Sequence, residues 1–244
     1  MPIIKLILEY DGTAYAGWQR QPDRPTIQEA VEDAIKGVTQ TKVSVIGAGR
    51  TDAGVHAIGQ VASFRIDRTM TPREWTRALN AHLPETIVVQ SAAIMPDTFH
   101  ARYSAKGKLY EYRLLNRNER PAVDRQYCWH IYKPLNDDVM NHAAMFLIGS
   151  HDFSSFQTQP TENDDPICHL QRLAVFREGD RLRIETYADR FLKQIVRSIV
   201  GTLVEIGLNK RPPNSLEAIL HARDRSAAGK TAPPQGLFLT RVDY

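Results

Sequence analysis

The chain has 244 residues, of which 42% are hydrophobic and 24% are charged. This length and composition can bury the core of one large domain or of two smaller lobes. No stretch approaches the roughly 18 consecutive apolar residues of a membrane helix. The first ten residues alternate in polarity, which excludes a signal peptide. We therefore expect a cytoplasmic protein without a membrane partner.

Charge and cysteine content exclude little and give one weak indication. The formal net charge is only +3, but 22 of the 31 basic residues are arginines. Arginine binds phosphates and base edges with a planar fork of donors, so this bias favours a nucleic-acid partner, although it also follows genome composition. Cys128 and Cys168 lie far apart, with no CxxC spacing. We predict reduced, structural thiols and no metal site.

The first half of the chain alternates strand and helix patterns. Apolar residues at every second position predict strands, and those at three- and four-residue spacing predict helices. Two Thr-x-x-Glu capping boxes, at Thr26 and Thr71, mark where the helices begin. The predicted order is a strand over Ile3–Tyr10, a helix after Thr26, strands over Val43–Ile46 and Gln60–Ile66, a helix from Thr71 to about His82, and a strand over Ile87–Ile94.

The second half repeats this order. A Glu-Gly-Asp turn joins two alternating runs as a hairpin, and a long apolar stripe after it predicts a buried helix. The predicted order is a strand over Lys108–Leu115, a helix over Asn136–Ile148, strands over His169–Phe176 and Arg181–Tyr187, a helix over Leu192–Val204, a short helix capped near Asn214, and a strand over Leu237–Tyr244.

Each half therefore reads β-α-β-β-α-β, which predicts an α+β fold of two ferredoxin-like or RRM-like halves. We place the halves at residues 1–105 and 106–244. Two such halves can set their sheets side by side with the helices on one face. By analogy with RNA-binding sheets, the other face would form a central RNA-binding cleft.

A glycine-rich loop, Gly47–Ala57, carries the strongest chemical signal. It does not open a helix, as a dinucleotide fingerprint would, and it lacks the Lys of a Walker loop. Arg50 and Asp52 are two residues apart, so in extended backbone their side chains point to the same side. A surface ion pair would explain the two residues alone, but the surrounding glycines favour a built site.

The loop sequence GAGRTDAGVHA resembles the signature of the TruA family of tRNA pseudouridine synthases at all eleven positions. Further segments resemble family motifs in the expected order: Tyr10–Thr13 with Gly17–Gln19, Lys108–Arg113, His151–Phe153, Phe191–Leu192 with Val196–Arg197, and Ala232–Pro233 with Gly236–Leu237. The match spans nearly the whole chain. Ile195 and Pro234 depart from the pattern, at what we interpret as packing positions.

The resemblance implies a cofactor-independent isomerase that converts uridine to pseudouridine at positions 38, 39 and 40 of the tRNA anticodon stem-loop. It assigns catalysis to Asp52, and substrate binding to Tyr110, Arg197 and Arg50. Asp52 would attack C1′ or remove a sugar proton, and the sequence leaves both routes open. Tyr110 would stack on the uracil and help to remove the proton from C5, and Arg197 would keep a buried carboxylate charged. Arg50 would fill the space that the flipped nucleotide vacates, or would hold that nucleotide.

A second RNA-contacting stretch is predicted over Phe99, His100, Ala101, Arg102 and Tyr103, where rings alternate with a cation. A strand linking the two halves is the plainer interpretation of the same residues. The resemblance also implies a homodimer with one tRNA lying across both subunits.

Two other functions remain open from the residues alone. A non-catalytic protein with two RNA-recognition units would explain the fold pattern, but not an acidic residue in a loop facing phosphates. A base-excising glycosylase would also use a carboxylate, but it would release free uracil.

Overall fold

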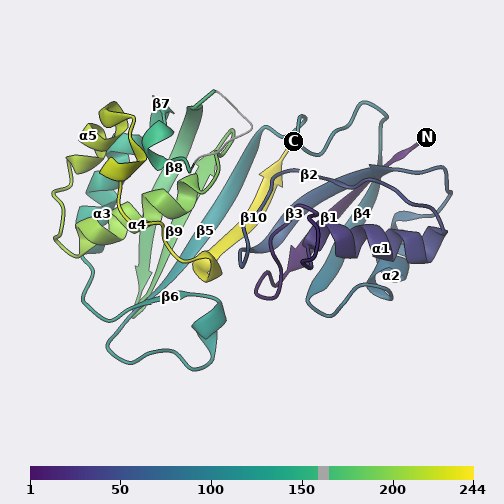
Figure 1. Cartoon of the computed structure of the whole chain (residues 1–244), viewed down its shortest axis with the longest axis horizontal. Helices are drawn as coiled ribbons and strands as arrows, with labels where there is room; N and C mark the ends of the chain where they lie inside the picture. Colours follow the sequence, from purple (N-terminus) through teal and green to yellow (C-terminus); the bar gives the residue numbers. More distant parts are fainter. Residues whose placement is uncertain (159–164) are drawn as a thin grey trace. The chain divides into compact units, whose positions relative to one another are not determined.

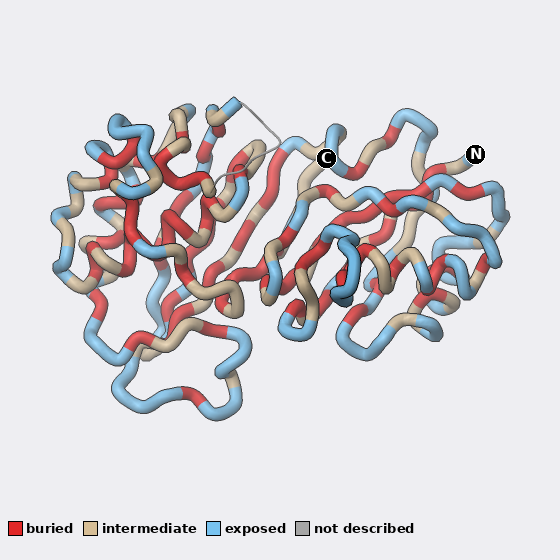
Figure 2. Tube along the Cα trace, in the orientation of Figure 1, coloured by how far each residue is buried: buried red, intermediate tan, exposed pale blue. Residues whose placement is uncertain are grey.

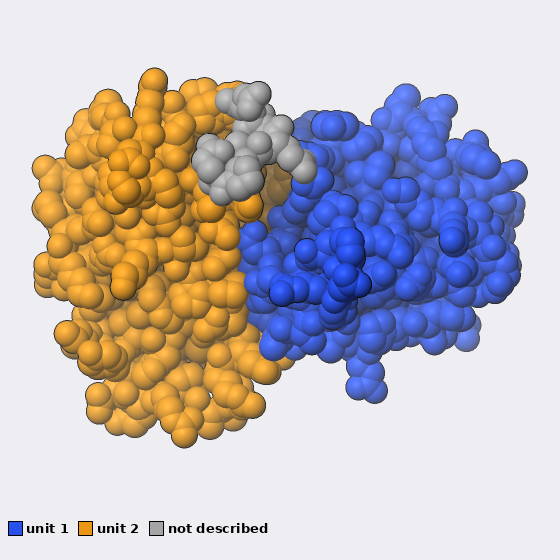
Figure 3. All heavy atoms as spheres, in the orientation of Figure 1, with its two compact units in different colours: residues 1–106, 238–244 blue, residues 107–237 orange. Residues whose placement is uncertain are grey.

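The computed structural model describes residues 1–158 and 165–244. The chain divides into two compact units: unit 1 holds residues 1–106 and 238–244, and unit 2 holds residues 107–237 (Figure 3). Helices pack on a mostly antiparallel sheet in each unit, so the predicted α+β class is confirmed. The division differs from the predicted 1–105 and 106–244 at the end of the chain, because residues 238–244 fold with unit 1.

Unit 1 contains the first strand–helix series and the last strand of the chain (Figure 1). Its elements are β1 (Ile3–Tyr10), α1 (Ile27–Thr39), β2 (Ile46–Gly47), β3 (His56–Arg65), α2 (Pro72–Asn80), β4 (Ile87–Met95) and β10 (Leu237–Asp243). The sheet order is β4-β1-β3-β10, with β2 also paired to β3. β1 is antiparallel to both neighbours, whereas β10 runs parallel to β3.

The two helices of unit 1 begin at the predicted caps. The Thr26 side chain accepts a hydrogen bond from Glu29 N at the start of α1. Thr71 and Glu74 form the complete reciprocal capping box of α2, which also has Pro72 in its first turn. At both helices a threonine side chain satisfies a backbone donor that the first turn leaves unpaired, which explains why both helices begin where the sequence predicts. The reciprocal half of the box predicted at Thr26 is not formed.

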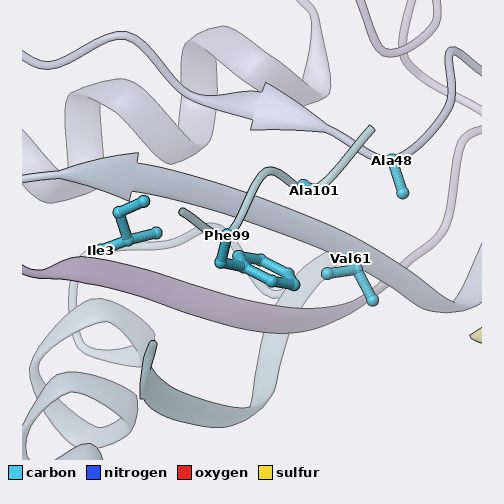
Figure 4. Packing of buried hydrophobic residues seen from close by; sticks show 5 residues of the cluster. All are labelled: Ile3, Ala48, Val61, Phe99 and Ala101. Carbon is cyan, nitrogen blue, oxygen red and sulfur yellow. The ribbon is translucent and has the colours of Figure 1, made fainter. Parts of the chain in front are cut away.

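Both faces of the unit 1 sheet are covered in part. One face carries Ile4 of β1 and its cross-strand partner Phe64, whose ring meets Trp75 of α2 edge-on at 5.5 Å. On the opposite face, Ile3 and Val61 pack with Ala48, Phe99 and Ala101 in a buried cluster (Figure 4). Residues 99–101 therefore cover part of the face that we predicted to be open for RNA.

Unit 2 contains more strands than the sequence predicts. Its elements are β5 (Gly107–Asn116), β6 (Trp129–Ile131), α3 (Asp137–Ala144), β7 (Gly149–Asp152), β8 (Ile167–Glu178), β9 (Arg181–Ala188), α4 (Ile195–Gly207) and α5 (Ser215–Ala222), with short 3-10 turns over 124–126, 145–147, 154–156, 225–227 and 234–236. The sheet order is β5-β9-β8-β7, with β6 parallel to β5. The second half thus gains β6 and β7, and its predicted closing strand is β10 of unit 1.

Helix α4 is the buried helix of unit 2. Eleven of its thirteen residues are buried, so the predicted stripe is enclosed on nearly all sides. The covering segment includes Lys230 and Ala232: a Cβ on Gly201 would clash with the Lys230 carbonyl, and Ala232 N donates to Arg197 O. Figure 2 shows this burial along α4.

Two predicted boundaries in unit 1 are wrong. The strand predicted over Val43–Ile46 is reduced to β2, because α1 side chains take the place of a strand partner: Gln28 Nε2 donates to Val45 O (3.0 Å), and Glu32 Oε1 accepts from Val45 N (3.1 Å). β3 begins at His56, inside the segment predicted as loop.

Unit 2 shows smaller departures. The helix predicted over Asn136–Ile148 is α3 followed by a 3-10 turn over Met145–Leu147. Asn214 occupies the N-cap position of α5 without a capping hydrogen bond from its side chain. Across the described ranges 1–158 and 165–244, no helix combines the length and apolarity needed to cross a membrane.

Candidate active site

The glycine-rich loop runs from β2 into β3 on unit 1. Exposure alternates along its centre: Arg50 is exposed, Thr51 is buried and Asp52 is half-buried. Ala48 and Val55 are buried on either side. The loop is therefore anchored through small and apolar residues, while Arg50 and Asp52 remain accessible to a substrate.

The first loop of the chain supports this segment from behind. Trp18 N donates to Thr51 O (3.0 Å). Gly17, at φ +102°, lies so close that a Cβ there would be 2.6 Å from Thr51 O and 3.1 Å from the Asp52 carbonyl carbon. Only glycine permits both this backbone conformation and this approach. The Gly-Trp-Gln segment thus fixes the backbone that carries Asp52.

The aromatic ring of Trp18 fills the space beneath the loop. Trp18 is 2% exposed, and a Cβ on Gly47 would come within 2.5 Å of its indole ring. Tyr10 packs beside it with ring centroids 6.3 Å apart. The beginning of the loop is therefore held against two buried rings.

Thr51 is tied to the strands by a buried hydrogen-bond chain. Gln60 Nε2 donates to the Tyr10 hydroxyl oxygen (3.4 Å) and to Gly49 O (2.8 Å). The Tyr10 hydroxyl and Thr51 Oγ1 share a hydrogen bond of 2.8 Å, in which either group can be the donor. Burial raises the pKa of Tyr10 to about 12, against the opposing effect of the Thr51 and Gln60 hydrogen bonds, so this hydroxyl stays protonated at neutral pH.

His56 closes the loop at its far end. It is 1% exposed, and its ring stacks on Phe238 of β10 with centroids 4.7 Å apart. Gly12 N donates to His56 Nδ1 (3.1 Å). Asp11 Oδ1 lies 3.2 Å from the same nitrogen. This histidine therefore joins the first loop, the glycine-rich loop and the last strand.

Arg50 leaves the loop toward the first loop of the chain. Its Nε donates to Gln19 Oε1 at 3.0 Å, and Gln19 Nε2 donates to Gln28 Oε1 of α1 at 2.8 Å. The guanidinium is therefore oriented by side chains outside its own loop.

Tyr110 lies in unit 2, on β5. It is 6% exposed, and its ring meets Phe191 edge-on with centroids 5.0 Å apart. Tyr112 lies two residues along the strand, fully buried, and its hydroxyl donates to Pro233 O (2.7 Å). Burial raises the Tyr112 pKa far above its usual value. Tyr112 is thus a core residue of unit 2.

Arg197 lies in the first turn of α4 and is half-buried. Its Nε donates to Ala232 O (2.8 Å), next to the carbonyl that binds Tyr112. The positive charge of Arg197 lowers the Tyr112 pKa, although burial outweighs this effect. The Ala-Pro segment therefore holds Arg197 near Tyr112 of β5, within unit 2.

The stretch predicted to bind RNA divides into two parts. Phe99 (9% exposed) and Ala101 (0% exposed) are core residues. Tyr103 is 79% exposed, with the His100 ring 4.4 Å from its centroid and the Arg102 guanidinium carbon 5.9 Å away. Because Phe99 and Ala101 are buried, the side chains of this stretch that RNA can reach are those of His100, Arg102 and Tyr103.

Sequence reasoning missed the residues that support the loop. Trp18 and Gln19 lie in a quoted family motif, and Gly17 before them is the one local signal of close packing. Gln28 reads only as a polar position on α1. Among the described residues, His, Cys, Asp and Glu side chains form no group of three placed to hold a metal ion.

Comparison with known proteins matches residues 6–104 and 143–244 to a family model described as tRNA pseudouridine synthase. Proteins named tRNA pseudouridine synthase A are similar over nearly their full lengths. The one from Thermoanaerobacter sp. (strain X514) is 46% identical over 99% of both chains. The one from Rhodopseudomonas palustris (strain BisA53) is 47% identical over 100% of both. The one from Allorhizobium ampelinum is 44% identical over 100% of this chain and 95% of the relative.

One solved chain, from a structure titled "Crystal Structure of a Cbf5-Nop10-Gar1 Complex", covers 97% of this chain and 58% of its own length at 12% identity, with a TM-score of 0.37. That likeness is too remote to bear on the fold or the function.

The similarity over the full length of the chain defines an isomerase that acts on tRNA. The chain belongs to the tRNA pseudouridine synthase family, and it converts uridine to pseudouridine in tRNA. Family membership therefore decides against a non-catalytic RNA-binding protein and against a base-excising glycosylase.

Proposed function

We propose that the chain isomerises the uridines at positions 38, 39 and 40 of the tRNA anticodon stem-loop, without a cofactor. The family motifs support this site, because they extend over the whole chain in the family's order. The reaction breaks the N1–C1′ bond, turns the base and joins C5 to C1′. Nothing is oxidised and no group enters from outside, so side chains alone can supply the chemistry.

Asp52 is the proposed catalytic carboxylate. The observation that carries this assignment is the close support of its backbone by Gly17, which would be unnecessary for a solvated surface ion pair. The carboxylate either attacks C1′ or removes a sugar proton. A fixed backbone suits both routes, because a reacting oxygen must be held close to its target atom.

Tyr110, Arg197 and Arg50 complete the proposed site. Tyr110 stacks on the uracil and helps to remove the proton from C5. Arg197 keeps the carboxylate charged where water is excluded. Arg50 holds the nucleotide in its flipped position. Asp52 and Arg50 lie in unit 1, and Tyr110 and Arg197 lie in unit 2.

The exposed part of the 99–103 stretch is proposed to contact the tRNA body. His100, Arg102 and Tyr103 offer two rings and a cation, the combination that stacks on bases and neutralises phosphates. A homodimer binding one tRNA across both subunits is proposed with it, on the family resemblance alone.

The proposed positions can be tested with purified protein and anticodon stem-loop RNAs that carry a single uridine at 37, 38, 39, 40 or 41. We expect pseudouridine at 38, 39 and 40, formed without added metal or cofactor. Product at 37 or 41, or none at 38–40 in intact tRNA, would refute the proposed site while leaving family membership intact.

A further inference from the structure

We infer that Gln28 and Gln19 are positioning residues for Arg50, which they hold through a directional chain of hydrogen bonds. The inference rests on the proposed role of Arg50 in holding the flipped nucleotide. Arg50 Nε donates to Gln19 Oε1 (3.0 Å), and Gln19 Nε2 donates to Gln28 Oε1 (2.8 Å). These two hydrogen bonds thus connect the glycine-rich loop to helix α1.

The donors in this chain allow one orientation of each amide. A guanidinium only donates, so Gln19 must present its oxygen to Arg50 and its NH2 to Gln28. Gln28 must then present its oxygen, which also accepts from Arg20 N (2.8 Å). Turning either side-chain amide over would place donor against donor or acceptor against acceptor. The series of hydrogen bonds therefore has a single favourable arrangement.

Gln28, at the end of this series of hydrogen bonds, is held firmly in place. Gln28 is 8% exposed although it is a polar residue. Its Nε2 donates to Val45 O (3.0 Å) and to Glu32 Oε1 (3.2 Å), and Glu32 Oε1 also accepts from Val45 N (3.1 Å). Burial and these bonds fix Gln28, so the flexible, exposed Arg50 is oriented from a rigid residue of α1.

A fixed guanidinium matters more for the chemical step than for binding the tRNA body. A long exposed arginine samples many rotamers, and holding it in one removes an entropy cost from the transition state. Loss of the Arg50–Gln19–Gln28 hydrogen bonds should therefore slow isomerisation while the affinity for tRNA changes little. A purely structural role would change stability instead, and would act independently of Arg50.

A double-mutant cycle separates these roles. Gln28→Met and Gln19→Met are each made in the wild-type chain and in Arg50→Ala, with Gln171→Met, exposed on β8, as the matched control. Single-turnover rates on anticodon stem-loop RNA, tRNA dissociation constants and unfolding free energies are measured. Gln19 is exposed, so Gln19→Met keeps the test open if Gln28→Met folds poorly.

We expect each glutamine variant to lower the single-turnover rate about tenfold, the value of a hydrogen bond to a charged group. In the Arg50→Ala background the further loss should be less than about twofold. Dissociation constants and the Gln171→Met rate should stay within about twofold of the wild type. The same fold loss in both backgrounds would overturn the inference and leave the Arg50 proposal standing. An unchanged rate for Arg50→Ala alone would overturn both.

Discussion

Replacing Gly17 by Ala should damage catalysis through the backbone of the Asp52 loop. The new Cβ would lie 2.6 Å from Thr51 O, about 0.8 Å short of the 3.4 Å of ordinary van der Waals contact. The alanine would also have to adopt the backbone angle φ +102°, which residues with L side chains rarely adopt. The loop must therefore move by most of an ångström or the first loop must detach.

We expect both the isomerisation rate and the free energy of unfolding to fall. A misplacement near 1 Å costs about 10²-fold in rate, so we expect the isomerisation rate to fall about 30- to 100-fold. Backbone strain and overpacking together should lower the free energy of unfolding by about 2–4 kcal/mol. The rate follows from tritium released when C5 of [5-³H]uridine in tRNA bonds to C1′, and the free energy from urea unfolding.

Gly179→Ala is the matched control. Gly179, in the β8–β9 turn, also has a positive φ, of +59°, but a Cβ there meets nothing within 4 Å. It should cost about 1–2 kcal/mol of stability and leave the rate unchanged. If Gly17→Ala folded and isomerised uridine as fast as Gly179→Ala, the close approach would not position Asp52, and the reasoning would fail.

Three further predictions concern single side chains. Tyr110→Phe keeps the ring contact with Phe191, so we expect stability and tRNA affinity near wild type and a rate at least about tenfold lower; an unchanged rate would limit Tyr110 to stacking. Burial raises the Tyr10 pKa to about 12, so the folded chain keeps a proton that the unfolded chain loses near pH 10. The contribution of the Tyr10 hydroxyl to the free energy of unfolding is therefore full below pH 10, and it falls by about 1.4 kcal/mol per pH unit between pH 10 and pH 12. Urea unfolding across this range should show a shallower alkaline loss for Tyr10→Phe, and an equal loss would contradict the buried hydroxyl. Burial raises the Cys168 pKa to about 11, so alkylation at pH 8 should be slow in the folded chain, with about 10⁻³ of the thiol as thiolate; alkylation as fast as in urea would place Cys168 outside the core.

Local signals predicted the elements of unit 1 well. The Thr71–Glu74 box forms as predicted, and the alternating run Ile3–Tyr10 is β1 with the same bounds. These outcomes follow from side chains and backbone groups only a few residues apart. Such interactions can be found in the sequence without knowledge of the tertiary structure.

Long-range pairing defeated the same reasoning. β10 looks like any closing strand of the second half, yet it pairs in parallel with β3 through Phe238–His56 and Leu239–Ala57. Nothing in its alternation says which sheet it joins, because period-2 burial is the same beside any partner. Phe99 likewise looked like a base-stacking ring, but it packs on Ile3 and Val61.

The candidate site was predicted in part. Its motif residues Arg50, Asp52, Tyr110 and Arg197 stand out in the sequence through glycine density or family resemblance. Most of the supporting contacts do not, because they join residues far apart in the sequence, such as Gln19 with Arg50 (31 positions) and Gly12 with His56 (44 positions). A sequence shows which side chains can do chemistry more readily than which ones hold them.

The most direct test of the account is the turnover of Asp52→Asn, which keeps the shape of the side chain and removes its charge. Asp67→Asn, at an exposed position after β3, serves as the matched control. We predict that Asp52→Asn folds and binds tRNA as the wild type does and forms pseudouridine at less than about one hundredth of its rate. A folded, tRNA-binding Asp52→Asn chain that retained more than that fraction would contradict the assignment of Asp52 as the catalytic carboxylate.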